Sequence, residues 1–236
     1  MTEFPRYAVY FAPDTDSSLW QFGSAVLGYD AASRVDPPFI MPPDFESPEW
    51  SALTQEPRQY GFHATLKAPF HLSQGHNEKA LLERAGEIAR QEIGFALDGL
   101  HVAALGSFIA LVPVGDTSWL NAFALRFVEG FENFRAPLSP ADRARRLKSP
   151  LNNDQLVNLD RYGYPYVGKE FRFHMTLTGL LHTEIMAKVL VALAARFQDS
   201  VAPGKLLIDR IAIFRQDAAD ERFHLLQSFA LAPIRP

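Results

Sequence analysis

The stretch YGFHATLKAPF at residues 60–70 alternates apolar and polar side chains, which is the period of a β-strand with one buried face. A second stretch, EFRFHMTLT at residues 170–178, alternates in the same way. Each contains the tetrapeptide His-x-Thr-Leu, with the His and the Thr two positions apart on the polar face. The sequence therefore predicts two strands that present the same chemistry: His63 and Thr65 on one, His174 and Thr176 on the other.

The patterns that come after each stretch are also alike. The first motif precedes a helical pattern at residues 77–93 and two strand patterns at 95–105 and 107–114 that turn near Gly106. The second precedes a helical pattern at residues 184–197 and strand patterns at 205–214 and 222–232. This recurrence predicts an α+β fold: one bilobal domain over residues 1–236, in which two pseudo-symmetric lobes of antiparallel β-sheet with outer helices face each other across an active-site cleft. The approximate lobes are residues 1–134 and 135–236.

The remaining patterns are a strand at residues 6–12 and helices at 17–27 and 117–134. Residues 36–57 contain six prolines and predict an ordered but irregular loop. A loop of this length is either a lid or binding segment, or a surface excursion with one short helix that begins at Ser47-Pro48. The sequence does not choose between these two.

Composition limits the function classes. Nearly half of the 236 residues are apolar, which excludes disorder for most of the chain, and the net charge of −4 argues against binding to long nucleic acids. Cysteine is absent, so thiol nucleophiles, disulfides and cysteine-based metal sites are excluded. With neither a signal-peptide pattern nor an apolar stretch long enough for a membrane span, we expect a cytoplasmic protein without membrane contact.

The segment between the two repeats holds two candidate features. Ser139-Pro140-Ala141-Asp142 predicts a helix start, followed by the basic run Arg143, Arg145, Arg146 and Lys148. Such a run is most often a solvated helix face, and we interpret it so. The sequence LDRYGYPY at residues 159–166 predicts a rigid aromatic loop, whose tyrosines either stack on a base or sugar or pack against the neighbouring lobe.

Two His and two Thr in a symmetric set suit chemistry at phosphorus. Opening a phosphodiester requires one group to deprotonate the attacking oxygen and another to protonate the leaving oxygen, and His can fill either role near neutral pH. The Thr hydroxyls can bind the non-bridging oxygens. Lys67 and Arg172 lie on the same polar faces, and we expect them to assist in binding, together with Tyr60 and Tyr164.

A metal site is the weaker interpretation. Two His from different strands would need a third ligand, Glu170 is the one obvious candidate, and no H-E-x-x-H motif is present. We therefore expect neither a metal nor another cofactor.

At these two motifs the chain resembles the 2H phosphoesterase superfamily, whose mark is a pair of His-x-Thr/Ser motifs on facing β-lobes. Within it, residues 60–70 and 171–179 look like a bacterial uncharacterised family labelled as phosphonate-metabolism proteins. The resemblance covers most of the chain, and both motifs are intact. It implies metal-independent cyclic phosphodiesterase activity, with His63 and His174 as the acid and base and Thr65 and Thr176 as phosphate ligands.

The resemblance further implies a small phosphorylated partner, namely the cyclic phosphate of a sugar or nucleotide, with an association with phosphonate metabolism. Two other functions stay open. The protein could be a non-catalytic module that binds a phosphorylated ligand in the same cleft, which turnover would distinguish. It could also be an RNA-end processing or ligating enzyme, for which the basic run at residues 143–148 would supply the charged track.

Overall fold

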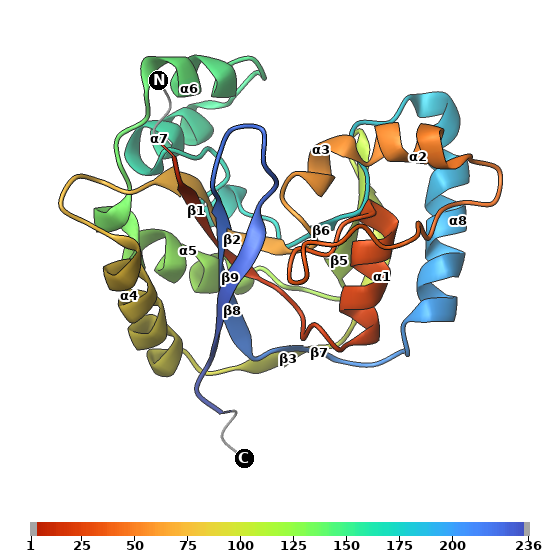
Figure 1. Cartoon of the computed structure of the whole chain (residues 1–236), viewed down its shortest axis with the longest axis horizontal. Coiled ribbons are helices and arrows are strands. Elements are labelled where there is room, and N and C mark those ends of the chain that lie inside the picture. The colour runs from red at the N-terminus through yellow and green to blue at the C-terminus, as the bar shows by residue number, and fades with distance from the viewer. Residues whose placement is uncertain (1–3, 234–236) are drawn as a thin grey trace.

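A seven-stranded sheet forms the centre of the computed structural model, which describes residues 4–233 (Figure 1). Its strand order is β4-β5-β6-β2-β1-β8-β9, and a separate two-stranded sheet pairs β3 with β7. Every ladder between these strands is antiparallel. The strands are β1 (Arg6–Phe11), β2 (Ala64–His71), β3 (Phe95–Leu97), β4 (Leu100–Leu105), β5 (Phe108–Pro113), β6 (Met175–Thr176), β7 (Leu206–Ile208), β8 (Arg210–Gln216) and β9 (His224–Ala230).

Helices lie in two groups on either side of the central strands. In the view of Figure 1, α4 to α7 lie to the left, and α1 to α3 and α8 to the right. The helices are α1 (Ser18–Leu27), α2 (Ser47–Leu53), α3 (Gln55–Arg58), α4 (Glu78–Gln91), α5 (Leu120–Gly130), α6 (Pro140–Arg146), α7 (Asn153–Tyr162) and α8 (Thr183–Ser200), with 3₁₀ turns η1 (Glu132–Phe134) and η2 (Gly168–Glu170). The α+β class with antiparallel sheet and outer helices is as predicted. Within residues 4–233, no helix is both long enough and apolar enough to cross a membrane.

The apolar face predicted for the first motif strand is buried. Phe62, Ala64, Leu66 and Phe70 are all at most 4% exposed, and they belong to a core that joins the strands to α1, α4, α5 and α8. Burying this face removes apolar surface from water, which is the main favourable term in folding. The alternate positions of the strand are thereby left for the site.

The order of elements recurs after each motif, as predicted: β2-α4-β3-β4-β5 and then β6-α8-β7-β8-β9. In both repeats, the strand predicted after the helix breaks into two, at Asp98-Gly99 in the first and at Asp209 in the second. Gly99 has a φ of 146°, a conformation that favours glycine. The two short strands released by these breaks, β3 and β7, pair with each other.

The strands of the two halves of the sequence interleave. β8 and β9 follow the second motif, yet they extend the sheet beside β1, while β5 and β4 follow the first motif and lie beside β6. A boundary at residues 134/135 therefore does not divide the sheet, and the two approximate lobes stay a prediction.

Two details differ from the sequence-based predictions. The second motif strand is only two residues long, because residues 168–170 form η2 and the backbone before Met175 is irregular. Helix α7 was not predicted, although Asn152 and Gln155 form a capping box at its start.

The proline-rich residues 36–57 contain α2, which begins at Ser47 with Pro48 in its first turn, and the start of α3.

Candidate active site

The two His-x-Thr motifs lie next to each other at the centre of the sheet. β2 and β6 pair antiparallel through Ala64 and Met175, whose side chains are both completely buried. The residues on either side of this pair point to the opposite face of the sheet, and antiparallel register places each His opposite the Thr of the other motif. Directly opposite side chains have Cβ atoms about 4.5–5.5 Å apart. The crossed pairs are His63 with Thr176, and Thr65 with His174.

All four motif side chains line one cavity of about 430 Å³, which we call the motif pocket. Tyr60 and Tyr164 line it as well, so the structure brings together six of the eight predicted site residues. The aromatic loop therefore reaches the pocket through Tyr164. Tyr162 is instead buried beside Val128, and Tyr166 is exposed.

Both imidazole rings are held in the same way. Nδ1 of His63 lies 2.9 Å from the carbonyl oxygen of Gly61, and Nδ1 of His174 lies 2.7 Å from that of Arg172. Because a carbonyl oxygen only accepts, each Nδ1 donates its proton there, and each neutral ring keeps its lone pair on Nε2. The Thr65 hydroxyl lies 3.2 Å from Nε2 of His63 and donates to it. In each motif Nε2 is thus the nitrogen available for proton transfer.

Burial disfavours the charged form of both rings. It lowers the pKa of His63 to about 3, and the charge of His174 contributes in the same direction. Burial also lowers the pKa of His174. His63 stacks on Tyr10 with ring centroids 3.6 Å apart, and His174 packs on Phe108 at 5.6 Å. An anion in the pocket would oppose these shifts, because a nearby negative charge favours the protonated imidazole.

Lys67 does not reach the motif pocket. Its side chain is 3% exposed, and the ammonium donates to the Val128 carbonyl and to the Glu132 carboxylate, each at 2.8 Å. As strand alternation predicts, Lys67 does not share the face of Ala64. At this end of β2, however, α5 and η1 cover the strand, and their residues Val128 and Glu132 bind the Lys67 ammonium. The predicted contact between Lys67 and a ligand held by the two motifs is therefore not available.

Arg172 lies beside the motif pocket rather than in it. It is exposed and lines a neighbouring cavity of about 530 Å³, whose wall shares Thr65, Tyr164 and His174 with the motif pocket. Its backbone carbonyl, not its guanidinium, contacts the site through His174.

Three arginines that were not predicted as site residues line the motif pocket: Arg6 from β1, and Arg145 and Arg146 from α6. The basic run was interpreted as a solvated helix face. This is right for Arg143, which pairs with Asp160 at 2.9 Å, and for Arg145, which is exposed although it also lines the motif pocket. It is wrong for Arg146, which is partly buried in the wall of that pocket. Positions 143 and 145 lie roughly 200° apart around a helix, and therefore on opposite faces. This spacing could have indicated from the sequence that the basic run does not lie on a single face.

Across residues 4–233, the structure holds no cluster of three or more His, Cys, Asp or Glu side chains arranged to bind a metal ion. The candidate third ligand, Glu170, instead accepts a hydrogen bond from Gln155 at 2.7 Å.

Comparison with known proteins gives relatives in sequence and in structure. The chain is 39% identical over 215 residues to "Ribose 1,5-bisphosphate phosphokinase PhnN" of Janthinobacterium sp. (strain Marseille), which covers 90% of this chain and 48% of that protein. It is 33% identical over 220 residues to the protein of the same name from Laribacter hongkongensis (strain HLHK9), covering 93% and 50%. The chain thus spans about half the length of the curated relatives it matches.

Among solved structures, E. coli LigT complexed with 3'-AMP matches with a TM-score of 0.44 and 13% identity, covering 97% of this chain and 99% of that one. TT0787 of Thermus thermophilus matches with a TM-score of 0.43 and 16% identity, covering 98% and 100%. A family model described as "Protein of unknown function (DUF1045)" matches residues 65–224, which include the first motif from Thr65 and the whole of the second. The chain belongs to this family.

Proposed function

We propose that the protein is a metal-independent phosphodiesterase that opens a small cyclic phosphate by acid–base catalysis between His63 and His174. The observation that carries this proposal is the crossed pairing of two His and two Thr around one pocket, with both Nδ1 atoms tied to the backbone. Two fixed proton-transfer groups on either side of one binding position are what an in-line displacement at phosphorus requires.

The unequal environments suggest which His does what. His63 has the more strongly lowered pKa, so it is neutral over the working range and suits the base. Its Nε2 takes a proton from water as the water oxygen attacks phosphorus. The protonated His174 gives its Nε2 proton to the leaving oxygen as the P–O bond breaks. The product is a phosphomonoester with a free hydroxyl, and proton exchange with solvent restores both rings.

The Thr hydroxyls complete the phosphate contacts. Thr65 donates to His63 Nε2 in the free protein, so its hydroxyl has to rotate toward a non-bridging oxygen when substrate binds. Thr176 stands opposite His63 across the strands and donates from the other side. Preorganised donors of this kind act on charge that grows in the transition state.

The kinase activity in the relatives' name is not carried over to this chain. A phosphate-binding kinase loop reads G-x-x-x-x-G-K-[ST] between a strand and a helix. Residues 163–170 read GYPYVGKE, so Glu170 stands where Ser or Thr is needed, and the stretch joins α7 to η2. Lys169 is exposed and paired with Asp154. We retain from that name only a phosphorylated sugar as the substrate class, in keeping with the association with phosphonate metabolism.

The proposal is tested by assaying a panel of cyclic phosphates of sugars and nucleotides with the wild-type protein. We expect turnover of at least one small cyclic phosphate, and loss of that turnover in each single His variant. Saturable binding of these compounds without turnover would favour the non-catalytic binding module instead.

We predict that chelation leaves the activity intact, because both proton-transfer groups are protein side chains and the scheme uses no metal. The rate should be measured before and after extended dialysis against EDTA. Loss of turnover that zinc or manganese restores would contradict the scheme.

A further inference from the structure

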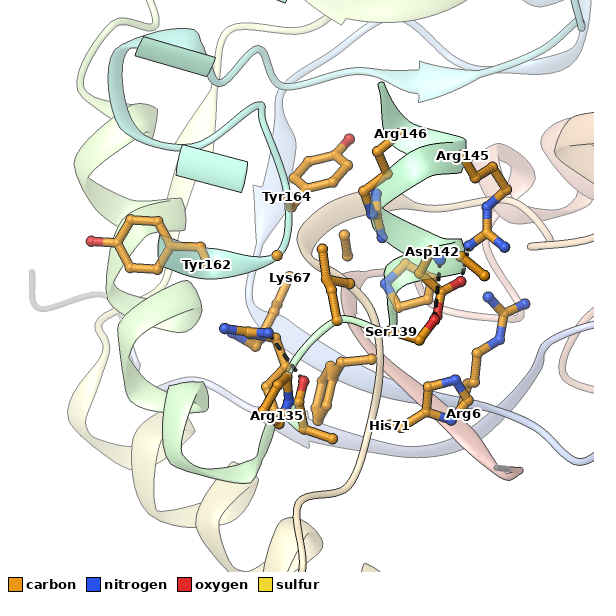
Figure 2. A pocket seen from close by; sticks show the side chains of 18 of the residues that line it. Arg6, Lys67, His71, Arg135, Ser139, Asp142, Arg145, Arg146, Tyr162 and Tyr164 are labelled. Atoms are coloured by element: carbon orange, nitrogen blue, oxygen red, sulfur yellow. Dashed lines mark hydrogen bonds and ion pairs between the residues drawn. The ribbon is translucent and has the colours of Figure 1, made fainter. Parts of the chain in front are cut away.

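A second cavity adjoins the motif pocket beneath α6 (Figure 2). It has a volume of about 480 Å³. The wall common to the two cavities contains Ala68 and Pro69 from β2, Tyr164, and the three arginines described above, Arg6, Arg145 and Arg146. The acid–base scheme uses none of these arginines, so their gathering at this position needs another explanation.

Arg146 is a partly buried cation without an acid to pair with. Its Nε is buried and has no hydrogen-bond partner among residues 4–233, and no described carboxylate lies within ion-pair distance of its guanidinium. Its closest favourable contact is the ring of Tyr164, with 5.4 Å from Cζ to the centroid. Leaving a donor of a charged group unsatisfied inside a protein is costly, and a bound anion would remove that cost.

Arg6 is held by neutral groups. Both its Nε and Nη2 donate to the amide oxygen of Gln216, the former at 2.7 Å, and its guanidinium lies over the ring of Phe223. No carboxylate within the described part of the chain pairs with it. Gln216 thus orients the group without neutralising it.

Asp142 is the single carboxylate among the described residues that line the cavity beneath α6 (Figure 2). The motif pocket is also lined by Glu56, which forms no ion pair with these arginines in the described part of the chain. Asp142 lies 2.8 Å from Arg145 and also accepts a hydrogen bond from Ser139 at 2.8 Å. Three guanidinium groups facing one carboxylate leave two positive charges uncompensated. Lys67 and Arg135 line the same cavity and share Glu132 between them, so they do not reduce this excess.

The arginine cluster meets the motif pocket away from the His and Thr side chains. Along β1, Tyr10 is the partner of Thr65 and Arg6 is the partner of His71. Arg6 lies four positions before Tyr10, which corresponds to about 13 Å between their backbones. The cluster is therefore placed for a group at the far end of a ligand whose other end lies on the motifs.

We propose that Arg6, Arg145 and Arg146 form a second phosphate subsite, so that the substrate is a cyclic phosphodiester that carries a phosphomonoester at its other end. This proposal rests on the proposed function of the motif pocket. A phosphomonoester carries a charge close to −2 at neutral pH and accepts several hydrogen bonds, which matches two uncompensated guanidinium charges. The cyclic diester then lies at the His and Thr side chains, and the subsite fixes the substrate from its other end.

Binding of ribose 5-phosphate, which has a phosphomonoester but no cyclic ester, tests the subsite without turnover. Titration calorimetry should give a Kd that rises about 10- to 100-fold in Arg146→Met, the effect of losing charge-assisted hydrogen bonds. Arg143→Met is the matched control, because Arg143 lies on the same helix and pairs outward with Asp160, and it should bind as the wild type does. The double variant His63→Ala/His174→Ala should also keep its affinity.

The same titration can overturn the subsite. If the His double variant loses binding while Arg146→Met keeps it, the phosphomonoester sits on the motifs and the subsite is wrong. Absence of binding to the wild-type protein, or equal losses in Arg143→Met and Arg146→Met, would overturn it as well.

Turnover then separates the subsite from the proposed function. The wild-type protein should hydrolyse ribose 1,2-cyclic phosphate with a kcat/KM about 10- to 100-fold lower than that of its 5-phosphorylated form, and Arg146→Met should narrow this ratio. Equal rates on the two compounds would overturn the subsite and leave the phosphodiesterase standing. If ribose 5-phosphate binds but neither compound is turned over, the proposed phosphodiesterase activity is wrong. The arginine cluster would then remain an anion subsite, and the cyclic-ester part of the proposal would be wrong.

Discussion

Replacing His63 by Ala should lower kcat on the best cyclic phosphate by about 10²- to 10⁴-fold, the usual contribution of a general acid or base. His174→Ala should lower it by a similar factor. The reason is that the contact between Nδ1 and a backbone carbonyl orients each ring so that its Nε2 is available for proton transfer. Alanine removes that group. Steady-state kinetics of the purified variants measures the effect.

The double variant sharpens this prediction. An acid and a base that act in one concerted step form a unit, so losing both should cost little more than losing the more damaging one. His101→Ala is a suitable control, because His101 is exposed on β4 and outside the motif pocket. Thermal melts should show that all variants remain folded. Near wild-type activity in either single variant would mean that the His concerned is not catalytic.

Replacing Thr176 by Val should lower kcat by about 10²- to 10³-fold, the range found when one donor to a developing oxyanion is removed. Valine keeps the shape of threonine and loses the hydroxyl, and the position is only half-buried, so the fold should tolerate it. Thr176→Ser retains the donor and should recover most of the rate. If the valine variant instead raises KM and leaves kcat unchanged, the hydroxyl binds the ground state and does not act on the transition state.

Much of the fold could be predicted because periodicity reports which face of an element is buried. Alternation at residues 60–70 identified Ala64 and Leu66 as core and His63 and Thr65 as the other face, and the structure agrees. Helices with caps and amphipathic faces, such as α1 and α4, were also found near their observed bounds. These features depend on neighbouring residues only, and so the sequence contains them.

The features that the sequence did not reveal depend on contacts between distant segments. The strand pattern predicted that Lys67 binds the ligand, but its ammonium pairs with Glu132, which lies 65 residues later in the sequence. The sequence pattern predicted a solvated Arg146, yet α6 places it over Tyr164 in the wall of the pocket that Arg6 also lines. The interleaving of β8 and β9 with β1 is likewise a matter of which edge each hairpin joins, and strand alternation does not encode the partner.

The pH dependence of kcat/KM tests the acid–base account most directly, because it reports the ionisation of the free protein. His63 has to be neutral, which holds above its lowered pKa of about 3, and His174 has to be protonated, which holds below its own pKa, itself lowered from 6.5. The account predicts a bell-shaped pH profile of kcat/KM with its maximum below pH 6.5. The two limbs of the profile belong to the pair of His, and both limbs should change when either His is replaced. The bell for kcat should lie at higher pH, because the bound phosphate anion raises both pKa values. A kcat/KM that does not change with pH between the lowered pKa of His63 and neutrality would contradict the account. So would a bell-shaped profile that is unchanged in His63→Ala and His174→Ala.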